Sequence, residues 1–261
     1  MNRIEAKMAL LKEKKEKAFV TYMVAGLPDL NRTKELLRAQ EEAGVDVVEL
    51  GIPFSDPVAD GPVIQDASYQ SICLGTSLQN VFQMMKELRK ESMEIPVVFM
   101  MYYNTILHYG LGEFAKMCRE TGVDGLIVPD LPLEEQEELQ DALQKEAGAI
   151  LIQMVSPASK KRLPAILKGA RGFVSCVSSM GAAGQENTCH REVLSYLREV
   201  KEASDLPVFM GFESPTPKDV APMRNMIDGV IVGSHFVKFL QDSDYSAEEA
   251  KKYCRELKQA L

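Results

Sequence analysis

Short apolar segments alternate along the chain with longer segments in which apolar and charged residues recur at helical spacing. This alternation is typical of strand–helix units repeated around a parallel sheet, whose buried strands read as short β-branched runs. The predicted strands are Phe19–Val24, Val47–Leu50, Val97–Met101, Gly125–Val128, Ala149–Met154, Gly172–Val177, Val208–Gly211 and Gly229–Val232. Eight strand–helix pairs in about 250 residues are typical of a closed barrel. The pattern therefore predicts an α/β fold, a (β/α)8 TIM barrel that forms one domain over residues 1–261.

The helical segments between these strands repeat in a recognisable way. They are Arg32–Ala43, Leu78–Lys90, Glu113–Thr121, Leu133–Glu146, Arg191–Ala203 and Ser246–Ala260. Three segments, 43–50, 121–128 and 226–233, resemble one another, because in each an aspartate precedes an apolar strand. We interpret them as internal repeats of one unit. An extra helix, Ile4–Lys17, precedes the first strand and is expected to cover the N-terminal end of the barrel.

Two connections are longer than the others. Gly51–Ser77 follows the second predicted strand and Ser178–Cys189 follows the sixth. Long loops in compact domains are often functional, and loops that follow barrel strands lie at the C-terminal face, where catalysis occurs. Both connections are therefore expected to be long loops near the active site.

Composition and charge exclude several classes of protein. The chain has 38 acidic and 30 basic residues, a net charge of -8, which disfavours binding to nucleic acid. It shows neither the apolar run of a signal peptide nor one long enough to span a bilayer, so we expect a cytoplasmic protein with no membrane partner. Five widely spaced cysteines and three histidines form no metal-binding pattern, so no metal is expected and the thiols are expected to be reduced.

Candidate chemistry concentrates in residues 48–62, at the end of the second predicted strand. Glu49 lies within an apolar strand, where burial raises the pKa of a carboxyl and makes it a proton donor or acceptor near neutral pH. Alternatively, Glu49 points outward into solvent, although helices cover the outer face of a barrel strand. Asp56 and Asp60 follow in the loop, where an aspartate before proline or glycine is more often a turn former than a catalytic group.

The segment Glu49–Gln65 resembles the signature of the tryptophan synthase α chain family, and the match is highly specific. The resemblance covers essentially the whole chain. It continues through Ala25–Asp29, Met101–Asn104, Val128–Pro132, Gly181–Gly184, Gly211–Phe212 and Gly233–Ser234.

This resemblance implies an activity and a set of catalytic residues. The family cleaves indole-3-glycerol phosphate to indole and glyceraldehyde 3-phosphate by a retro-aldol reaction on an eight-stranded barrel, without a cofactor. By resemblance, Glu49 is the acid/base group, and Asp60 accepts the indole N–H and stabilises the cationic ring. Tyr102 lines the same pocket. A carboxylate beside a developing cation in a dry pocket is far more effective than in water.

The resemblance also implies a phosphate site and a partner. Backbone amides after strands six, seven and eight bind the phosphate, a common arrangement in barrels; here they belong to Gly184, Gly211, Phe212, Glu213, Gly233 and Ser234. The partner is a pyridoxal-phosphate-dependent β chain in an αββα assembly. The implied contact surface lies in segments 53–57, 101–108 and 130–132, with Pro53, Phe54, Ser55, Asp56, Pro57, Asn104 and Pro132 as its central residues.

Three places around the ligand depart from the family pattern. Glu213 replaces a glycine of the phosphate turn, where a carboxylate about 5 Å from a phosphate costs roughly 3 kcal/mol per phosphate charge. Ala183 and Ser179 replace a threonine and an arginine of the sixth loop, and Ser175 replaces a tyrosine near the indole. Three readings stay open: a lyase with weakened activity, a non-catalytic activator of the β chain, or a barrel with a different, possibly unphosphorylated ligand.

Overall fold

The computed structural model describes residues 1–146, 148–177, 186–212 and 221–261. Its strands form one parallel sheet in the order β5-β4-β3-β2-β1-β9-β8-β7-β6. The strands are β1 (Ala18–Val24), β2 (Val47–Gly51), β3 (Val97–Met100), β4 (Gly125–Ile127), β5 (Ile150–Leu151), β6 (Gln153–Val155), β7 (Val174–Cys176), β8 (Val208–Phe212) and β9 (Gly229–Val232). Consecutive strands are neighbours except β5 and β6, and β1 pairs with β9, as a barrel requires.

The two edges of this sheet meet at a single residue. β5 and β6 are the outermost strands, and only Ile152 separates them in the chain. The first half of this segment bonds to β4, with the Ile152 amide donating to the Leu126 carbonyl, and the second half pairs with β7. The predicted strand Ala149–Met154 is therefore divided in two because its halves bond to different neighbours. The TIM barrel is confirmed, with eight positions around the ring.

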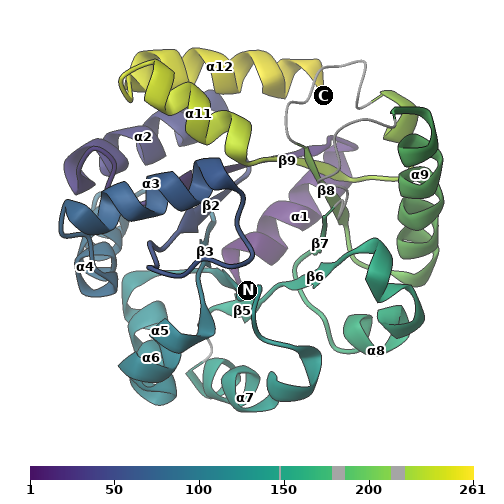
Figure 1. Cartoon of the computed structure of the whole chain (residues 1–261), viewed down its shortest axis with the longest axis horizontal. Helices are drawn as coiled ribbons and strands as arrows, with labels where there is room; N and C mark the ends of the chain where they lie inside the picture. Colours follow the sequence, from purple (N-terminus) through teal and green to yellow (C-terminus); the bar gives the residue numbers. More distant parts are fainter. Residues whose placement is uncertain (147, 178–185, 213–220) are drawn as a thin grey trace.

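The described helices lie around the outside of this sheet, except the first, which lies across one end of the ring (Figure 1). They are α1 (Arg3–Lys14), α2 (Leu30–Ala43), α3 (Pro62–Cys73), α4 (Leu78–Lys90), α5 (Tyr103–Tyr109), α6 (Leu111–Thr121), α7 (Glu137–Glu146), α8 (Leu163–Leu167), α9 (Glu186–Ala203), α11 (Ser234–Asp242) and α12 (Ala247–Ala260). Short 3₁₀ turns cover Leu133–Glu135, Pro157–Arg162 and Ala221–Met223. Within the described part of the chain, every helix is too short or too polar to cross a membrane.

The structure corrects the expectation of two long loops. The connection 51–77 contains the three-turn helix α3, and the connection 178–189 contains the start of α9 at Glu186. The sequence did not predict α3 because the buried positions of this helix are the small residues Ala67, Ser68 and Ser71, which leave no pattern of large apolar residues. Only residues 52–61 remain as an irregular segment after β2.

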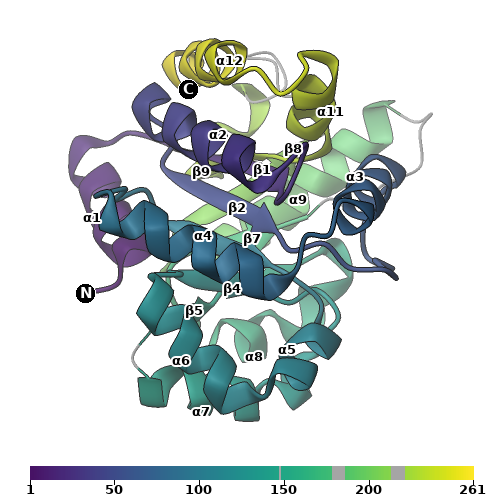
Figure 2. The ribbon, with the colours of Figure 1, turned by 90° about the vertical axis from the view of Figure 1, so that its left-hand side faces the viewer.

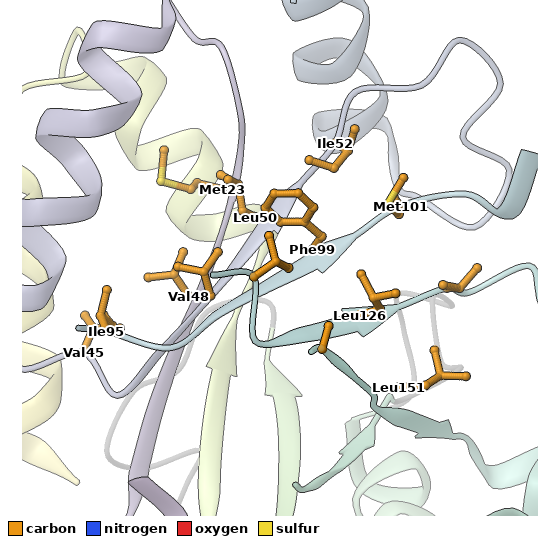
Figure 3. Close-up of a cluster of buried hydrophobic side chains, with 14 of the residues drawn as sticks. Met23, Val45, Val48, Leu50, Ile52, Ile95, Phe99, Met101, Leu126 and Leu151 are labelled. Atoms are coloured by element: carbon orange, nitrogen blue, oxygen red, sulfur yellow. The ribbon is translucent and has the colours of Figure 1, made fainter. Parts of the chain in front are cut away.

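The strand residues alternate between two apolar clusters. Val48, Leu50 and Phe99 belong to the large outer cluster between the sheet and the helices, part of which Figure 3 shows. Their neighbours Val47 and Val98 belong to a separate cluster inside the ring. Because side chains alternate along a strand, every second residue of β2 points into the barrel.

The interior of the barrel is closed at one end by α1, which Figure 2 shows across the sheet from α3. Ile4 of α1 is fully buried in the inner cluster. It fits because Gly125 and Gly172 leave room: a Cβ on either glycine would lie 2.8 Å or 3.3 Å from Ile4 side-chain carbons. The expected covering helix is therefore present, although it ends at Lys14 rather than Lys17.

The three sequence repeats make the same side-chain contact at the same end of the barrel. Asp46, Asp124 and Asp228 each accept a hydrogen bond from a backbone amide at the start of the preceding strand, at 2.8, 2.9 and 2.8 Å respectively. Each aspartate also pairs with a cation, of which Arg89, at 2.8 Å from Asp124, is the most buried. The contact satisfies a strand-end amide that would otherwise lack a partner.

Replacing Asp124 by alanine is expected to destabilise the fold by about 3 kcal/mol, because it removes the partners of the Val97 amide and of two arginines in a buried setting. Asp228→Ala is the matched control. Its side chain is 39% exposed, so water replaces the lost bonds and the expected cost is about 1 kcal/mol. Urea unfolding of both variants checks the difference, and equal losses would contradict the role of burial.

Candidate active site

Glu49 lies on the inner face of β2, toward the open end of the barrel. It pairs in register with Tyr22 of β1 and Val98 of β3, and Val47, two residues earlier, belongs to the inner cluster. Its relative exposure is 5%. The structure therefore rules out the alternative in which Glu49 points outward into solvent.

The surroundings of Glu49 favour its neutral form. Burial raises the pKa of Glu49 from 4.5 to about 8. Its Oε1 atom is buried and has no hydrogen-bond partner among the described residues. A buried carboxyl with an unpaired oxygen and a pKa near neutrality is equipped to give or take a proton.

Asp60 and Tyr102 face each other at the same end of the barrel. Tyr102, which follows β3, donates a hydrogen bond from its hydroxyl to Asp60 Oδ2 at 3.0 Å, and the hydroxyl accepts one from the Ala59 amide at 2.9 Å. Burial raises the pKa of Asp60, while the bond from Tyr102 acts in the opposite direction. Burial also raises the pKa of Tyr102, which keeps the hydroxyl protonated as a donor. Two carboxyl groups in different settings thus lie at one end of the barrel.

Residues 52–61 are held in place by two further contacts. Ser68 of α3 accepts a hydrogen bond from the Phe54 amide at 2.8 Å and donates one to the Phe54 carbonyl at 3.1 Å. The Phe54 ring stacks on Tyr102 with 5.0 Å between centroids. The small buried residues of α3 therefore allow the helix to lie close enough to hold the segment that carries Asp60 in position.

Beyond β1 in the ring, the ends of β9 and β8 form a second candidate subsite. Gly211 and Phe212 lie beside Ile231 and Val232 in register, so they adjoin Gly233, which caps α11, and Ser234, its first residue. A Cβ on Gly233 would meet no atom within 4 Å, which leaves its backbone open to a ligand. The first amides of a helix attract anions. Gly184 and Glu213, also predicted here, lie outside the described residues.

One pocket residue was missed by sequence reasoning. Tyr22 is buried beside Glu49, but the run Ala18–Val24 is apolar throughout and reads as an ordinary buried strand. The sequence indicated only that Tyr22 lies two residues after Val20 and four after Ala18, and therefore on the same inner face of the strand. Ser175 is also buried on the inner face of its strand, at 4% exposure, whereas Ala183 and Ser179 lie outside the described residues.

The three segments predicted to bind a partner adjoin one another. The first touches the second through the stacked rings of Phe54 and Tyr102, and the second touches the third through the Tyr103 amide, which donates to Asp130 Oδ1 at 3.0 Å. The side chains on this surface are exposed or half-buried; they include Pro53, Phe54, Ser55, Asp56, Pro57, Asn104 and Pro132. Val58 and Leu107 are 82% and 51% exposed. Together they form one continuous, partly apolar surface.

Known proteins resemble this chain over its full length. Residues 8–261 match the family model described as tryptophan synthase alpha chain. A tryptophan synthase alpha chain from Lachnospira eligens is 55% identical, covering 100% of this chain and 99% of its own length. The crystal structure of tryptophan synthase subunit alpha from Legionella pneumophila is 33% identical over 100% of this chain and 98% of that one, with a TM-score of 0.89. A tryptophan synthase complex from Pyrococcus furiosus matches at 31% identity over 94% of this chain and 99% of that one, with a TM-score of 0.83.

Proposed function

The chain belongs to the tryptophan synthase alpha chain family and is a lyase that cleaves indole-3-glycerol phosphate, and from that premise we propose that Glu49 and Asp60 perform the chemistry. The observation that carries the proposal is the inward-facing, buried and unpaired carboxyl of Glu49 at the open end of the barrel.

In the proposed reaction the Glu49 carboxyl gives its proton to C3 of the indole ring. The positive charge that results is shared with the ring nitrogen, whose N–H bonds to the Asp60 carboxylate. The Glu49 carboxylate then takes the proton of the C1′ hydroxyl of the glycerol chain, and the C3–C1′ bond breaks as the C1′–O double bond forms. The bonding electrons return to the ring, which leaves neutral indole, and the hydroxyl carbon becomes the aldehyde of glyceraldehyde 3-phosphate.

The different environments of the two carboxyls support these roles. Among the described residues no hydrogen bond reaches the buried Oε1 of Glu49 to stabilise a charge there, so the carboxyl keeps a proton to donate near neutral pH. Asp60 receives a hydrogen bond from Tyr102, which favours its ionised form. An ionised carboxylate beside a cationic ring in a water-poor pocket lowers the barrier by electrostatic stabilisation.

We assign the phosphate to the backbone amides at the ends of β8 and β9, with Gly184 and Glu213 as further members of that site. The surface formed by segments 53–57, 101–108 and 130–132 is assigned to a β chain, because the segments adjoin one another and the Pyrococcus furiosus relative is described as a complex. The αββα stoichiometry and the cytoplasmic location stay predictions from the sequence.

Indole release from indole-3-glycerol phosphate, measured with the chain alone and with its β chain, tests the proposal. We expect cleavage in both cases and faster cleavage with the partner. Stimulation of the β chain without cleavage would instead favour a binding partner whose catalysis has decayed. Calorimetry with glycerol phosphate and with unphosphorylated indoles tests the hypothesis that the barrel binds a ligand without phosphate. Binding that depends on phosphate would count against that hypothesis.

Tyr102→Phe is expected to lower kcat/KM by about fivefold to tenfold, because it removes one hydrogen bond to Asp60 and one from Ala59 while keeping the ring stacked on Phe54. Steady-state kinetics check this value. Tyr109→Phe serves as the control, because its hydroxyl bonds to the exposed side chain of Gln79. A Tyr102→Phe rate equal to that of the control would remove Tyr102 from the site.

A further inference from the structure

Tyr22 stands beside Glu49 inside the barrel, and the chemistry proposed above does not use it. The two residues pair in register on adjacent parallel strands, so their side chains leave the sheet on the same inner face. Tyr22 is 5% exposed. Its ring therefore forms one wall of the space around the Glu49 carboxyl.

Gly51 shows where the Tyr22 hydroxyl lies. A Cβ built on Gly51 would overlap the Tyr22 hydroxyl and would lie 2.7 Å from Cζ of the ring. Gly51 is two residues beyond Glu49 on the same face of β2, toward the open end of the barrel. The hydroxyl therefore stands one level above Glu49, on the side where Asp60 lies, in space that only a glycine leaves free.

The hydroxyl is a permanent hydrogen-bond donor. Burial raises the pKa of Tyr22 well above its usual value, and the negative charges of Asp60 and Glu49 act in the same direction. The phenol therefore stays protonated while neighbouring carboxyls titrate. In the part of the chain that the structure describes, the buried Oε1 of Glu49 has no hydrogen-bond partner.

We propose that Tyr22 is a positioning residue that acts through Glu49: its hydroxyl donates a hydrogen bond to the Glu49 carboxylate that forms when Glu49 releases its proton to the substrate. The proposed contact requires the Glu49 side chain to turn toward Gly51, where the Tyr22 hydroxyl lies. A hydrogen bond to the ionised form of a buried carboxyl stabilises that form. Tyr22 thus supplies what Glu49 lacks, a partner for its charge, and this inference rests on the proposed role of Glu49.

The other groups around Glu49 do not offer this bond. The titratable groups whose charges act on the Tyr22 hydroxyl in the described structure are Asp60, Glu49 and Tyr102. The Tyr102 hydroxyl already donates to Asp60. From the neighbouring strand β3 the inner residues are Val98 and Met100, which carry no hydrogen-bond donor in their side chains.

Tyr22→Phe tests the proposal, because it keeps the ring and removes only the hydroxyl. We expect kcat at pH 7 to fall about 10-fold to 100-fold, with KM changed by less than about threefold. The limb of the kcat pH profile that reports Glu49 is expected to move upward by about one pH unit. Tyr196→Phe is the control, because Tyr196 is equally buried at 5% exposure but packs in the outer cluster.

Infrared titration of the free chain separates this inference from the proposed function. The carboxyl band lost in Glu49→Gln assigns Glu49, and Tyr22→Phe is expected to raise the pH at which that band titrates. An unchanged titration together with an unchanged kcat would overturn the inference, as would a loss confined to KM, which would place the hydroxyl on the substrate instead. If the Glu49→Gln variant keeps full turnover while Tyr22→Phe still raises the pH at which the Glu49 band titrates, the proposed function is wrong. The hydrogen bond between Tyr22 and Glu49 is supported in that case.

Discussion

Glu49→Gln is expected to lower kcat for indole release by a factor of about 1,000, since positioned proton transfer contributes roughly 100-fold to 10,000-fold. Glutamine keeps the size and position of the side chain but has no proton to give. The buried, inward-facing setting offers no nearby substitute, because Asp60 lies at the open end and is engaged by Tyr102.

A stopped assay of indole release at saturating substrate measures this loss. Glu113→Gln, a change of the same type on the exposed face of α6, serves as the control and is expected to retain full activity. Turnover of Glu49→Gln within tenfold of the unsubstituted chain would refute the acid/base role. Retained binding of glycerol phosphate in the variant would show that the site is still formed.

The same substitution is expected to change how stability depends on pH. The pKa of Glu49 rises from 4.5 to about 8 on folding, so between these values the folded chain holds a proton that the unfolded chain has released. Stability therefore falls as pH rises through this window, by roughly 5 kcal/mol in all. Glutamine removes this contribution, so the variant is expected to gain stability relative to the unsubstituted chain as pH increases.

Urea unfolding of both chains at pH 5 and pH 9 checks the effect. The difference in unfolding free energy between the variant and the unsubstituted chain should be about 4 kcal/mol larger at pH 9 than at pH 5. Any fixed cost of burying the amide cancels in this comparison. Equal differences at the two pH values would mean that Glu49 is ionised at pH 7, and would contradict its use as a proton donor. A gain in the stability of the Glu49→Gln variant would show that the catalytic carboxyl lowers the stability of the fold.

Much of this fold follows from apolar spacing, because the sheet is parallel and buried on both faces. The strand runs and the large amphipathic helices α4 and α6 have apolar residues at most of their buried positions, so their pattern identifies them. The helix α3 was missed because it packs through alanine and serine. Small residues give close approach but little hydrophobic signal, and here that approach positions the segment that carries Asp60.

The candidate site was predictable to the extent that polar residues stand out. Glu49 is conspicuous within an apolar strand, and its inward direction follows from alternation along β2. Tyr22 is not conspicuous, because an aromatic residue fits any buried strand. Its relation to Glu49 depends on the register between β1 and β2 and on the missing side chain of Gly51, and neither can be deduced from one strand alone.

The pairing of β1 with β9 has a consequence for how the protein is made. Ala18 pairs with Gly229, so the ring cannot close until residues 229–232 have left the ribosome. Ile4 also cannot pack until later in synthesis, since it is buried against Gly125 and Gly172. Contacts between such distant parts of a chain form slowly and leave apolar edges exposed meanwhile. The nascent chain is therefore expected to depend on chaperones until its last strand is synthesised.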